Sequence, residues 1–476
     1  METAKTVESP ALQKKKAAPD LTNGNLFKQI LFFALPLLAT NILQLVFNTA
    51  DTIVVGRWGG DTPEACEIAL AAVGSSGSLS HLIINIFIGI SLGANVCIAR
   101  DIGAKHYEDA SRGVHTSVLL SIFFGLFSGV VGFVFAEPLL TLTGVTDQLL
   151  HEATLYMRAC FIGIPASLIY NFCASVLRAD GDTKHPLIFL SIAGVVNVGL
   201  NLVMVLVFRL GAMGVGIATA ASNWVSCFAV LVYLARKKGV THLQFSRLRI
   251  HKDKTKTIIA IGIPAGISSS FFSLSNVITQ SAINSFDETV IAANTAAQNL
   301  DGYIYQGQSA FSTAALTFVS QNIGAKKIDR VKKSIFFCAL LAAGFSAMLG
   351  GIFFLLGEML LSLYIPGNVA GIEIGMKRLL IVGATYPLCG LMETAAATLR
   401  GFGKSTISTV NSLCFACVFR IAWISFVFNL FHTIEMLYII YPLSWILTSI
   451  ANYIFCVVVF RKQKKKLTAA PLSATA

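Results

Sequence analysis

The sequence predicts an all-α polytopic membrane protein with 12 transmembrane helices, arranged as two parallel six-helix repeats. Three observations predict this fold class: the composition, the number of apolar segments and an internal repeat. The 476 residues are 55% apolar and only 13% charged, whereas an average soluble domain carries about 25% charged residues. This composition excludes a soluble enzyme, a disordered protein and a secreted disulfide scaffold. It also argues against nucleic-acid binding, despite a net charge of +12.

Twelve segments are apolar over about 20 residues, the length that crosses a bilayer. The predicted spans are residues 27–53, 69–98, 114–136, 153–177, 187–208, 212–235, 257–283, 291–319, 334–356, 377–399, 405–429 and 437–460. Alternate loops, together with the two termini, hold 30 of the 36 Lys and Arg residues, and the other loops hold Arg57, Arg158, Arg209, Lys377 and Arg378. Positive residues stay on the cytoplasmic side. The sequence therefore predicts a multi-pass protein of the bacterial cytoplasmic membrane with both termini inside.

An internal repeat relates the two halves of the chain. Ala-Leu-Pro at 34–36 recurs as Gly-Ile-Pro at 262–264, and Asp-Ile-Gly-Ala-Lys at 101–105 recurs as Asn-Ile-Gly-Ala-Lys at 322–326. The offset is 228 residues at the first anchor and 221 at the second, which predicts about seven extra residues in the first external loop, around 59–67. Each half contains six spans, so the repeats are parallel. Transporters built this way place substrate near the membrane midplane and rock one half against the other.

The repeat predicts five regions. These are a disordered cytoplasmic tail (1–26), an amino-terminal six-helix lobe (27–235), a basic cytoplasmic linker (236–256), a carboxyl-terminal lobe (257–460) and a basic cytoplasmic tail (461–476). No metal site or cofactor is expected, because the ten cysteines are scattered and the Cys414/Cys417 pair has no second pair to complete a zinc site.

Polar residues form stripes inside several spans. Residues three or four apart share one face of a helix, which groups Asn41, Gln44, Asn48 and Asp51; Ser269, Ser273, Asn276 and Gln280; Asn294, Gln298, Asp301, Tyr305, Gln308 and Ser312; and Asn197 with Asn201. Hydrogen bonding between helices explains any single Ser, Asn or Gln, but whole stripes favour a watered cavity. His81 is a further candidate titrating group, with ordinary packing as the alternative.

Four charges lie inside the apolar spans: Asp51, Asp301, Glu393 and Arg420. An isolated Asp or Arg at the midplane costs about 2.5–3.5 kcal/mol on insertion scales, so each should be paired, neutralised or hydrated. Depth along the helices favours Asp301 with Arg420 as a structural ion pair. Asp51 has no basic residue in the spans of its own half. A carboxylate in a partly dry site can exchange a proton near neutral pH, so Asp51 is the predicted coupling group. The alternative is an interfacial Asp that reaches the outer surface.

These residues resemble those of the multidrug and toxic compound extrusion (MATE) family. The resemblance rests on the two six-helix repeats, on Pro36 followed by Asp-Thr-Ile-Val-Val-Gly at 51–56, and on Leu-Arg pairs at 177–178 and 399–400 in corresponding turns. It implies a V-shaped pair of lobes that open alternately to the two sides. The implied activity is export of cationic or amphipathic compounds against inward flow of protons or sodium ions.

The resemblance also implies a cation site in the amino-terminal lobe. Its residues are Asp51, Asn171, Asn197, Asn201 and Thr219, with Pro36 bending the first span. Sodium-competent members often have Asp where this chain has Asn201, and a hard cation prefers anionic oxygen ligands, so protons are expected rather than sodium ions. The acids of the carboxyl-terminal lobe found in one branch of the family match Phe272 and Cys389 here. Glu393, which corresponds to Asn171 by the repeat, or Asp301 could serve that lobe instead.

The leading hypothesis is therefore a monomeric secondary antiporter that exports small cationic or amphipathic organic compounds. The expected cavity-lining residues are Pro36, Gln44, Asn48, Asn276, Gln280, Gln298, Asp301, Glu393 and Arg420. Three acids against one base inside the spans favour cationic cargo. The alternative within the same superfamily is a flippase of lipids or lipid-linked saccharides, for which a more basic cavity would be expected. A channel or a membrane-embedded enzyme is the alternative from another class.

Overall fold

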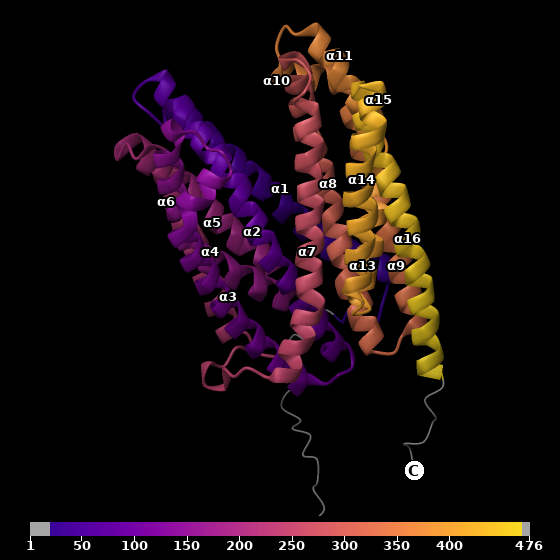
Figure 1. The fold of residues 1–476 in the computed structure, drawn as a ribbon. Helices are drawn as coiled ribbons and strands as arrows, with labels where there is room; N and C mark the ends of the chain where they lie inside the picture. The colour runs from indigo at the N-terminus through magenta and orange to yellow at the C-terminus, as the bar shows by residue number, and fades with distance from the viewer. Residues whose placement is uncertain (1–19, 469–476) are drawn as a thin grey trace, which may run out of the picture.

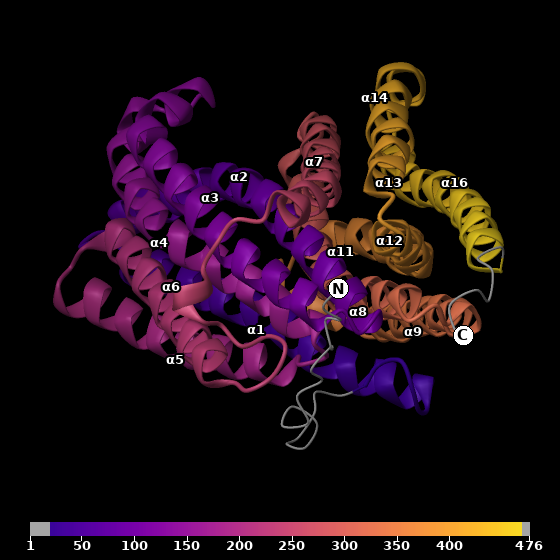
Figure 2. The ribbon, with the colours of Figure 1, turned by 90° about the horizontal axis from the view of Figure 1, so that it is seen from below.

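A computed structural model describes residues 20–468, except for the side chains of residues 78–83 and 466–468. The described chain is helical throughout, and the helices form two groups that diverge like the arms of a V (Figure 1). We call the end that carries the 104–106, 180–183 and 402–404 turns the basic end, and the opposite end the far end. Both ends of the described chain lie at the basic end (Figure 2).

Helices α1–α6 form the amino-terminal lobe and α7–α16 the carboxyl-terminal lobe. The amino-terminal lobe contains α1 (Leu26–Trp58), α2 (Pro63–Gly103), α3 (Tyr107–Leu142), α4 (Asp147–Ala179), α5 (Lys184–Leu202) with the π-helical turn η2 (Val203–Val207), and α6 (Gly211–Arg236). After the short η3 (Phe245–Arg247) come α7 (Lys252–Ile283), α8 (Glu288–Gly324), α9 (Ile328–Leu355), α10 (Gly357–Tyr364), α11 (Val369–Arg378), η4 (Leu379–Gly383) and α12 (Tyr386–Gly401). The next span consists of α13 (Ser405–Ser412), η5 (Leu413–Val418), α14 (Phe419–Trp423), η6 (Ile424–Phe428) and α15 (Asn429–Phe431). The last span is α16 (Ile434–Thr468).

Most of the predicted spans correspond to apolar helices. Among the described residues, ten helices are long and apolar enough to cross a membrane, and the bent pair Val369–Gly383 and Tyr386–Gly401 forms an eleventh span. The remaining predicted span, 291–319, corresponds to α8, a helix of 37 residues that is more polar and largely buried among its neighbours. Polar residues are tolerated there because they face other helices instead of lipid.

The internal repeat is visible in the backbone. Lys105 and Lys326, which follow Gly-Ala in the two halves, both adopt a left-handed conformation, with φ of 61° and 59°. The seven extra residues of the first half do not lengthen a loop as predicted, because the α1–α2 and α7–α8 connections each have four residues, 59–62 and 284–287. They lengthen helices instead. Four of them lie in α2, which has 41 residues where α8 has 37, and the other three lie in α1. Helix satisfies backbone groups internally, which makes it the favourable way to absorb an insertion in a membrane.

The two lobes meet near the basic end, where α2 crosses α8. A Cβ atom on Gly103 would overlap the carbonyl oxygen of Gln321, and one on Gly324 would overlap that of Arg100, so the crossing is symmetric under the repeat. Gln321 Nε2 donates to the carbonyl oxygen of Ala179 at 2.6 Å, and Arg100 Nη2 donates to that of Gly401 at 3.1 Å. These contacts hold the lobes together at the basic end.

Residues 20–25 are ordered, although the sequence predicts them as part of a disordered tail; residues 1–19 lie outside the described chain. Leu21 is only 2% exposed. Arg330, at the start of α9, donates to the carbonyl oxygens of Leu21 and Gly24 at 3.2 and 2.8 Å. A hydrophobic anchor and backbone hydrogen bonds therefore fix the segment that leads into α1 against the carboxyl-terminal lobe. At the other terminus, α16 continues to Thr468, past the predicted boundary at 460.

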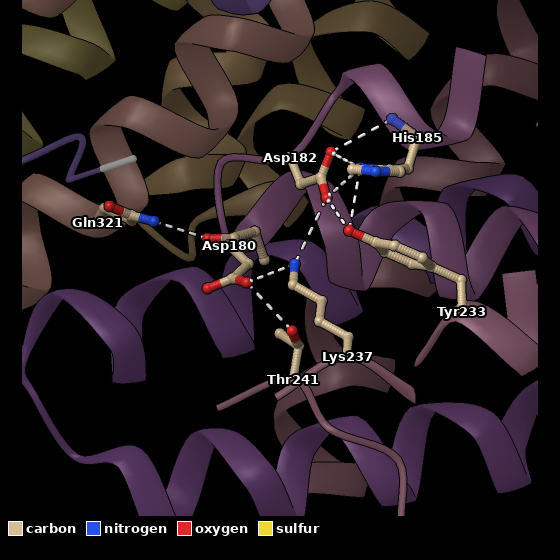
Figure 3. Close-up of polar contacts among 8 residues, drawn as sticks. Asp180, Asp182, His185, Tyr233, Lys237, Thr241 and Gln321 are labelled. Atoms are coloured by element: carbon tan, nitrogen blue, oxygen red, sulfur yellow. Dashed lines mark hydrogen bonds and ion pairs between the residues drawn. The ribbon is translucent and has the colours of Figure 1, made fainter. Parts of the chain in front are cut away.

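A charged cluster fixes the start of the linker 236–256 to the amino-terminal lobe (Figure 3). Lys237 Nζ lies 2.8 Å from Asp180 Oδ2 and 3.5 Å from Asp182 Oδ2. Thr241 Oγ1 donates to Asp180 at 3.1 Å, and Tyr233 OH donates to Asp182 at 3.0 Å. Burial raises the pKa of the Asp180 carboxyl above its usual value, even though Lys237 and Thr241 favour its ionised form. The cluster depends on Lys237 to compensate this buried charge.

Replacing Lys237 by methionine is expected to destabilise the protein more at pH 8 than at pH 5. The pKa of Asp180 is higher in the folded than in the unfolded state, so its contribution to stability is present at low pH and is lost as the pH rises through the folded pKa. Without Lys237 the buried carboxylate has no counter-charge above that pH. Apparent melting temperatures at both pH values test this expectation, with Lys238→Met, at an exposed neighbour, as the matched control. An equal loss at pH 5 and pH 8 would contradict it.

Candidate functional site

A group of polar residues surrounds Asp51 in the amino-terminal lobe, where the far-end half of α1 meets α5 and α6. Asn201 Nδ2 donates to Asp51 Oδ1 and lies 3.4 Å from Asn197 Oδ1. Asn197 Nδ2 lies 3.4 Å from Thr219 Oγ1, and Thr219 in turn is within hydrogen-bonding reach of Asp51. We call these four residues the Asp51 pocket. The structure brings together four of the five residues that the resemblance implies for the cation site.

Local helix geometry explains the arrangement of the pocket. Asn197 and Asn201 are one turn apart and share one face of α5. Asn201 is followed after one residue by the π-helical turn Val203–Val207, a backbone irregularity that is frequent at functional sites. Pro36 lies within the continuous helix α1, fifteen residues before Asp51 on the side of the basic end, and so it does not contribute to the pocket itself.

The pocket is partly exposed at Asp51 and buried at the two asparagines of α5. Asp51 is half-buried, whereas Asn197 and Asn201 are 5% and 0% exposed. The amide oxygen of Asn201 is buried and has no hydrogen-bond partner among the described residues. A buried acceptor without a donor is unfavourable. If Asp51 binds a proton and the Asn201 amide rotates, the Asp51 hydroxyl can donate a hydrogen bond to this oxygen.

The remaining residue of the implied site, Asn171, is not part of this hydrogen-bonded group. Its amide donates to the carbonyl oxygen of Ser167, one turn earlier in the same helix, at 2.8 Å. Two other residues of α4, Tyr156 and Cys160, lie close enough to Asp51 to interact with its charge, and they also bond to each other. Sequence reasoning missed them. Their spacing of four residues was the available signal, but both occur in an apolar stretch that is equally typical of a packed helix.

Most of the predicted cavity-lining residues lie in the far-end halves of α1, α7 and α8. Gln44, Asn48 and Gln298 are exposed, and Pro36, Asn276, Gln280 and Glu393 are half-buried. In contrast, the contacts between the lobes that involve α1 and α8 lie nearer the basic end: Asn41 Nδ2 donates to the carbonyl oxygen of Gln306, and the rings of Phe33 and Phe318 are 5.5 Å apart. On the far-end side of this junction the two lobes diverge (Figure 1). The side chain of His81 lies outside the described residues.

The predicted ion pair between Asp301 and Arg420 is wrong. Asp301 pairs with Arg378, whose Nε and Nη2 both lie 3.0 Å from Asp301 Oδ2, and both side chains are buried. Arg378 Nη1 also donates to Asn294 Oδ1 at 2.9 Å. The sequence predicts Arg378 in an external loop, but it ends the helix α11 and is buried beside Asp301 of α8. Asp301 and Arg378 thus form a buried structural pair through Asp301 Oδ2, while Asp301 Oδ1 is buried and has no hydrogen-bond partner among the described residues.

Arg420 is instead held by neutral groups. Its Nε donates to Ser444 Oγ at 3.1 Å, and its Nη1 donates to Asn276 Oδ1 at 2.9 Å. The guanidinium carbon lies 4.5 Å from the ring centroid of Tyr441 and 5.6 Å from that of Phe272. These aromatic faces stabilise the cation by cation–π interaction. Arg420 is 0% exposed, so it does not line a cavity in this conformation, contrary to expectation, and neither does Asp301, which is 2% exposed.

Glu393 has no hydrogen-bond or ion-pair partner among the described side chains, and it is half-buried on α12. It lies near Tyr305 and Cys389, with which it interacts electrostatically. The two positions where a branch of the family has acids are filled as the sequence predicts. Phe272 stacks on Tyr305 with a centroid distance of 6.1 Å, and Cys389 Sγ accepts a hydrogen bond from Gln308. Of the two described carboxyl groups near Cys389, Glu393 is half-buried and Asp301 is buried.

Two parallel helical repeats with polar groups inside membrane-spanning helices are typical of membrane transporters. The sequence profile of the MatE family matches residues 36–203 and again residues 264–429. The chain therefore belongs to the MatE family, and the two matches coincide with the two lobes. Because this is a family of transporters, the chain is not an enzyme.

Similar proteins agree with this assignment. The chain is 27% identical to the probable multidrug resistance protein YoeA of Bacillus subtilis, over 96% of this chain and 98% of the relative. It is 24% identical to an FAD transporter of Shewanella oneidensis, over 83% and 86% of the two chains. A multidrug resistance MATE family transporter solved in an outward-facing conformation superposes with a TM-score of 0.86 over 95% of this chain and 100% of the other, at 19% identity. This last similarity confirms the predicted two-lobe fold.

Proposed function

We propose that the chain is a secondary antiporter that exports cationic or amphipathic organic compounds in exchange for protons that bind Asp51. The basic end faces the cytoplasm of a bacterium, in keeping with the positive-inside rule. The observation that carries the proposal is the Asp51 pocket: one half-buried carboxylate, bound by amide and hydroxyl groups, beside a buried amide oxygen that lacks a donor. The names of relatives such as YoeA support export of drugs.

A proton suits this pocket better than a sodium ion. Sodium would need several oxygen ligands, preferably anionic ones, and Asp51 is the only carboxylate among the four residues of the pocket. Asn201 directs its N–H group, not its oxygen, toward Asp51. A protonated carboxyl group requires only one acceptor, and the free oxygen of Asn201 is close by.

The polarity of the accessible residues supports cationic cargo. The tally of three acids to one base within the spans is wrong, because Arg378 also lies there. However, Arg378 and Arg420 are buried, whereas Asp51 and Glu393 are half-buried and can meet a substrate. A flippase of lipids or lipid-linked saccharides would need accessible bases for anionic headgroups, so the structure favours the drug antiporter.

Transport into proteoliposomes under separately imposed gradients tests the proposal. We expect a proton gradient to drive uptake of an ethidium-type cation, and a sodium gradient of equal size to have no effect. An anionic dinucleotide, the kind of substrate named for the relative from Shewanella oneidensis, serves as the second substrate and should not be moved. Sodium-driven transport would contradict the proton assignment, and transport of only the dinucleotide would contradict the cargo assignment.

A further inference from the structure

An apolar groove lies on the amino-terminal lobe, between α3 and α4. It has a volume of about 240 Å³. Its walls include Leu126, Val130, Phe133, Val134, Phe161 and Ile162. Val130 and Ile162 are 61% and 57% exposed. A surface this apolar and this exposed faces the lipid of the membrane.

One end of the groove carries a pair of opposite charges. Arg158 lies one helical turn before Ile162 on α4, and its guanidinium carbon is 5.8 Å from the ring centroid of Phe133. Arg158 Nη2 lies 3.5 Å from Glu137 Oε2 of α3, which is too long for a close ion pair. Arg158 Nε is buried, but the two side chains are 37% and 57% exposed, which leaves the ends of both charged groups accessible. The pair thus retains donors and acceptors that can serve a ligand.

The position of Arg158 along α4 corresponds to the level of lipid phosphates. Arg158 and Arg178 are separated by 20 residues of continuous helix, which is about 30 Å at 1.5 Å per residue. The hydrocarbon core of a bilayer is also about 30 Å thick. With Arg178 at the interface of the basic end, Arg158 lies at the interface of the far end. On α3, residues 113–136 are free of charged side chains, and Glu137 follows at the same level.

We propose that this groove binds one phospholipid with a primary ammonium headgroup, of the phosphatidylethanolamine type, from the leaflet at the far end. An acyl chain occupies the groove, the phosphate accepts hydrogen bonds from Arg158, and the ammonium group donates to Glu137. The charge pair selects the headgroup. A quaternary choline cannot donate hydrogen bonds to Glu137, and phosphatidylglycerol has no cation to compensate the carboxylate beside its phosphate.

Native mass spectrometry of the full-length purified protein tests the proposal, with phosphatidylethanolamine, phosphatidylcholine and phosphatidylglycerol of identical acyl chains added separately. We expect occupancy of the first bound lipid to be at least five-fold higher for phosphatidylethanolamine. Arg158→Gln and Val130→Trp, which fills the exposed groove, should each lower this occupancy at least five-fold. Arg209→Gln, at another far-end arginine that pairs with Asp61, and Val195→Trp, at an exposed position of α5, are the matched controls and should bind as the unmodified protein does.

Equal occupancy by the three lipids, or preference for phosphatidylglycerol, would overturn the headgroup assignment. If Arg158→Gln is too unstable to measure, Val130→Trp decides alone, because its side chain projects into lipid and its replacement leaves the charge pair intact. Unchanged binding in Val130→Trp would overturn the placement of the acyl chain. Binding is read without transport, so either failure would leave the proposed antiport function standing.

Discussion

Replacement of Asp51 by asparagine is expected to reduce proton-driven export to the level of protein-free vesicles. Asparagine has nearly the same shape and can still accept a hydrogen bond from Asn201, so the helices around the pocket should pack as before. It cannot bind or release a proton near neutral pH. Initial rates of uptake of an ethidium-type cation into proteoliposomes, under an imposed proton gradient, measure the effect.

The matched control for this variant is Asp61→Asn, which removes a carboxylate at the far end whose side chain is 81% exposed. It should transport at the unmodified rate. The amounts of folded protein need to be equal, which size-exclusion chromatography establishes. Proton-driven efflux that persists in Asp51→Asn would remove Asp51 from the coupling mechanism, and Glu393, the other half-buried carboxyl group within the spans, would then become the candidate.

The second large effect concerns the ion pair between Asp301 and Arg378. Breaking a buried pair by removing one partner leaves an uncompensated charge and costs about 3–5 kcal/mol. Asp301→Leu and Arg378→Met are therefore each expected to lower the apparent melting temperature strongly. The double variant should recover most of the loss, since replacing both partners by apolar groups is often neutral or stabilising.

A matched control is available at the neighbouring residue. Lys377→Met removes an exposed pair with Glu435, in which the side chains are 56% and 36% exposed, and such surface pairs contribute at most about 1 kcal/mol. Additive losses in the double variant would show that Asp301 and Arg378 do not stabilise each other. A double variant that is stable but inactive would show that the pair takes part in transport, contrary to the structural role assigned here.

The overall architecture was predictable because it follows from composition and periodicity. Apolar segments of bilayer length identified the spans, and the recurrence of 101–105 at 322–326 identified the repeat, which the shared left-handed Lys105 and Lys326 and the two MatE matches confirm. The position of the seven extra residues was predicted wrongly. Sequence shows that residues have been inserted, but it does not show whether a loop or a helix absorbs them.

The ion pairs could not be predicted because irregular helices change both depth and direction. Counting residues along straight helices predicts Arg420 as the partner of Asp301. The span that carries Arg378 bends by 40° at its break, and the span that carries Arg420 contains the π-helical turns η5 and η6. Each π-helical turn rotates the residues that follow it. Arg420, which follows η5 by two residues, therefore faces Ser444 and Asn276. Arg378, which directly precedes η4, binds Asp301 instead.

The Asp51 pocket was partly predictable. Asn197, Asn201 and Thr219 were implied by the resemblance to the family, and the structure brings them to Asp51. Tyr156 and Cys160 could not be predicted, since a buried Tyr or Cys in an apolar helix has no pattern that distinguishes a pocket from ordinary packing. Their proximity to Asp51 depends on how α4 packs against α1 and α6, which is a property of the tertiary structure.

The most direct test of the central claim, that Asp51 couples proton movement to export, measures protons instead of substrate. Proteoliposomes loaded with a pH-sensitive dye receive an outwardly or inwardly directed gradient of the transported cation, with no imposed pH gradient. We expect the cation gradient to drive protons in the opposite direction with the unmodified protein, and Asp51→Asn to abolish this proton movement. Proton movement that is unchanged in Asp51→Asn, or cation transport by the unmodified protein without any proton movement, would contradict the account.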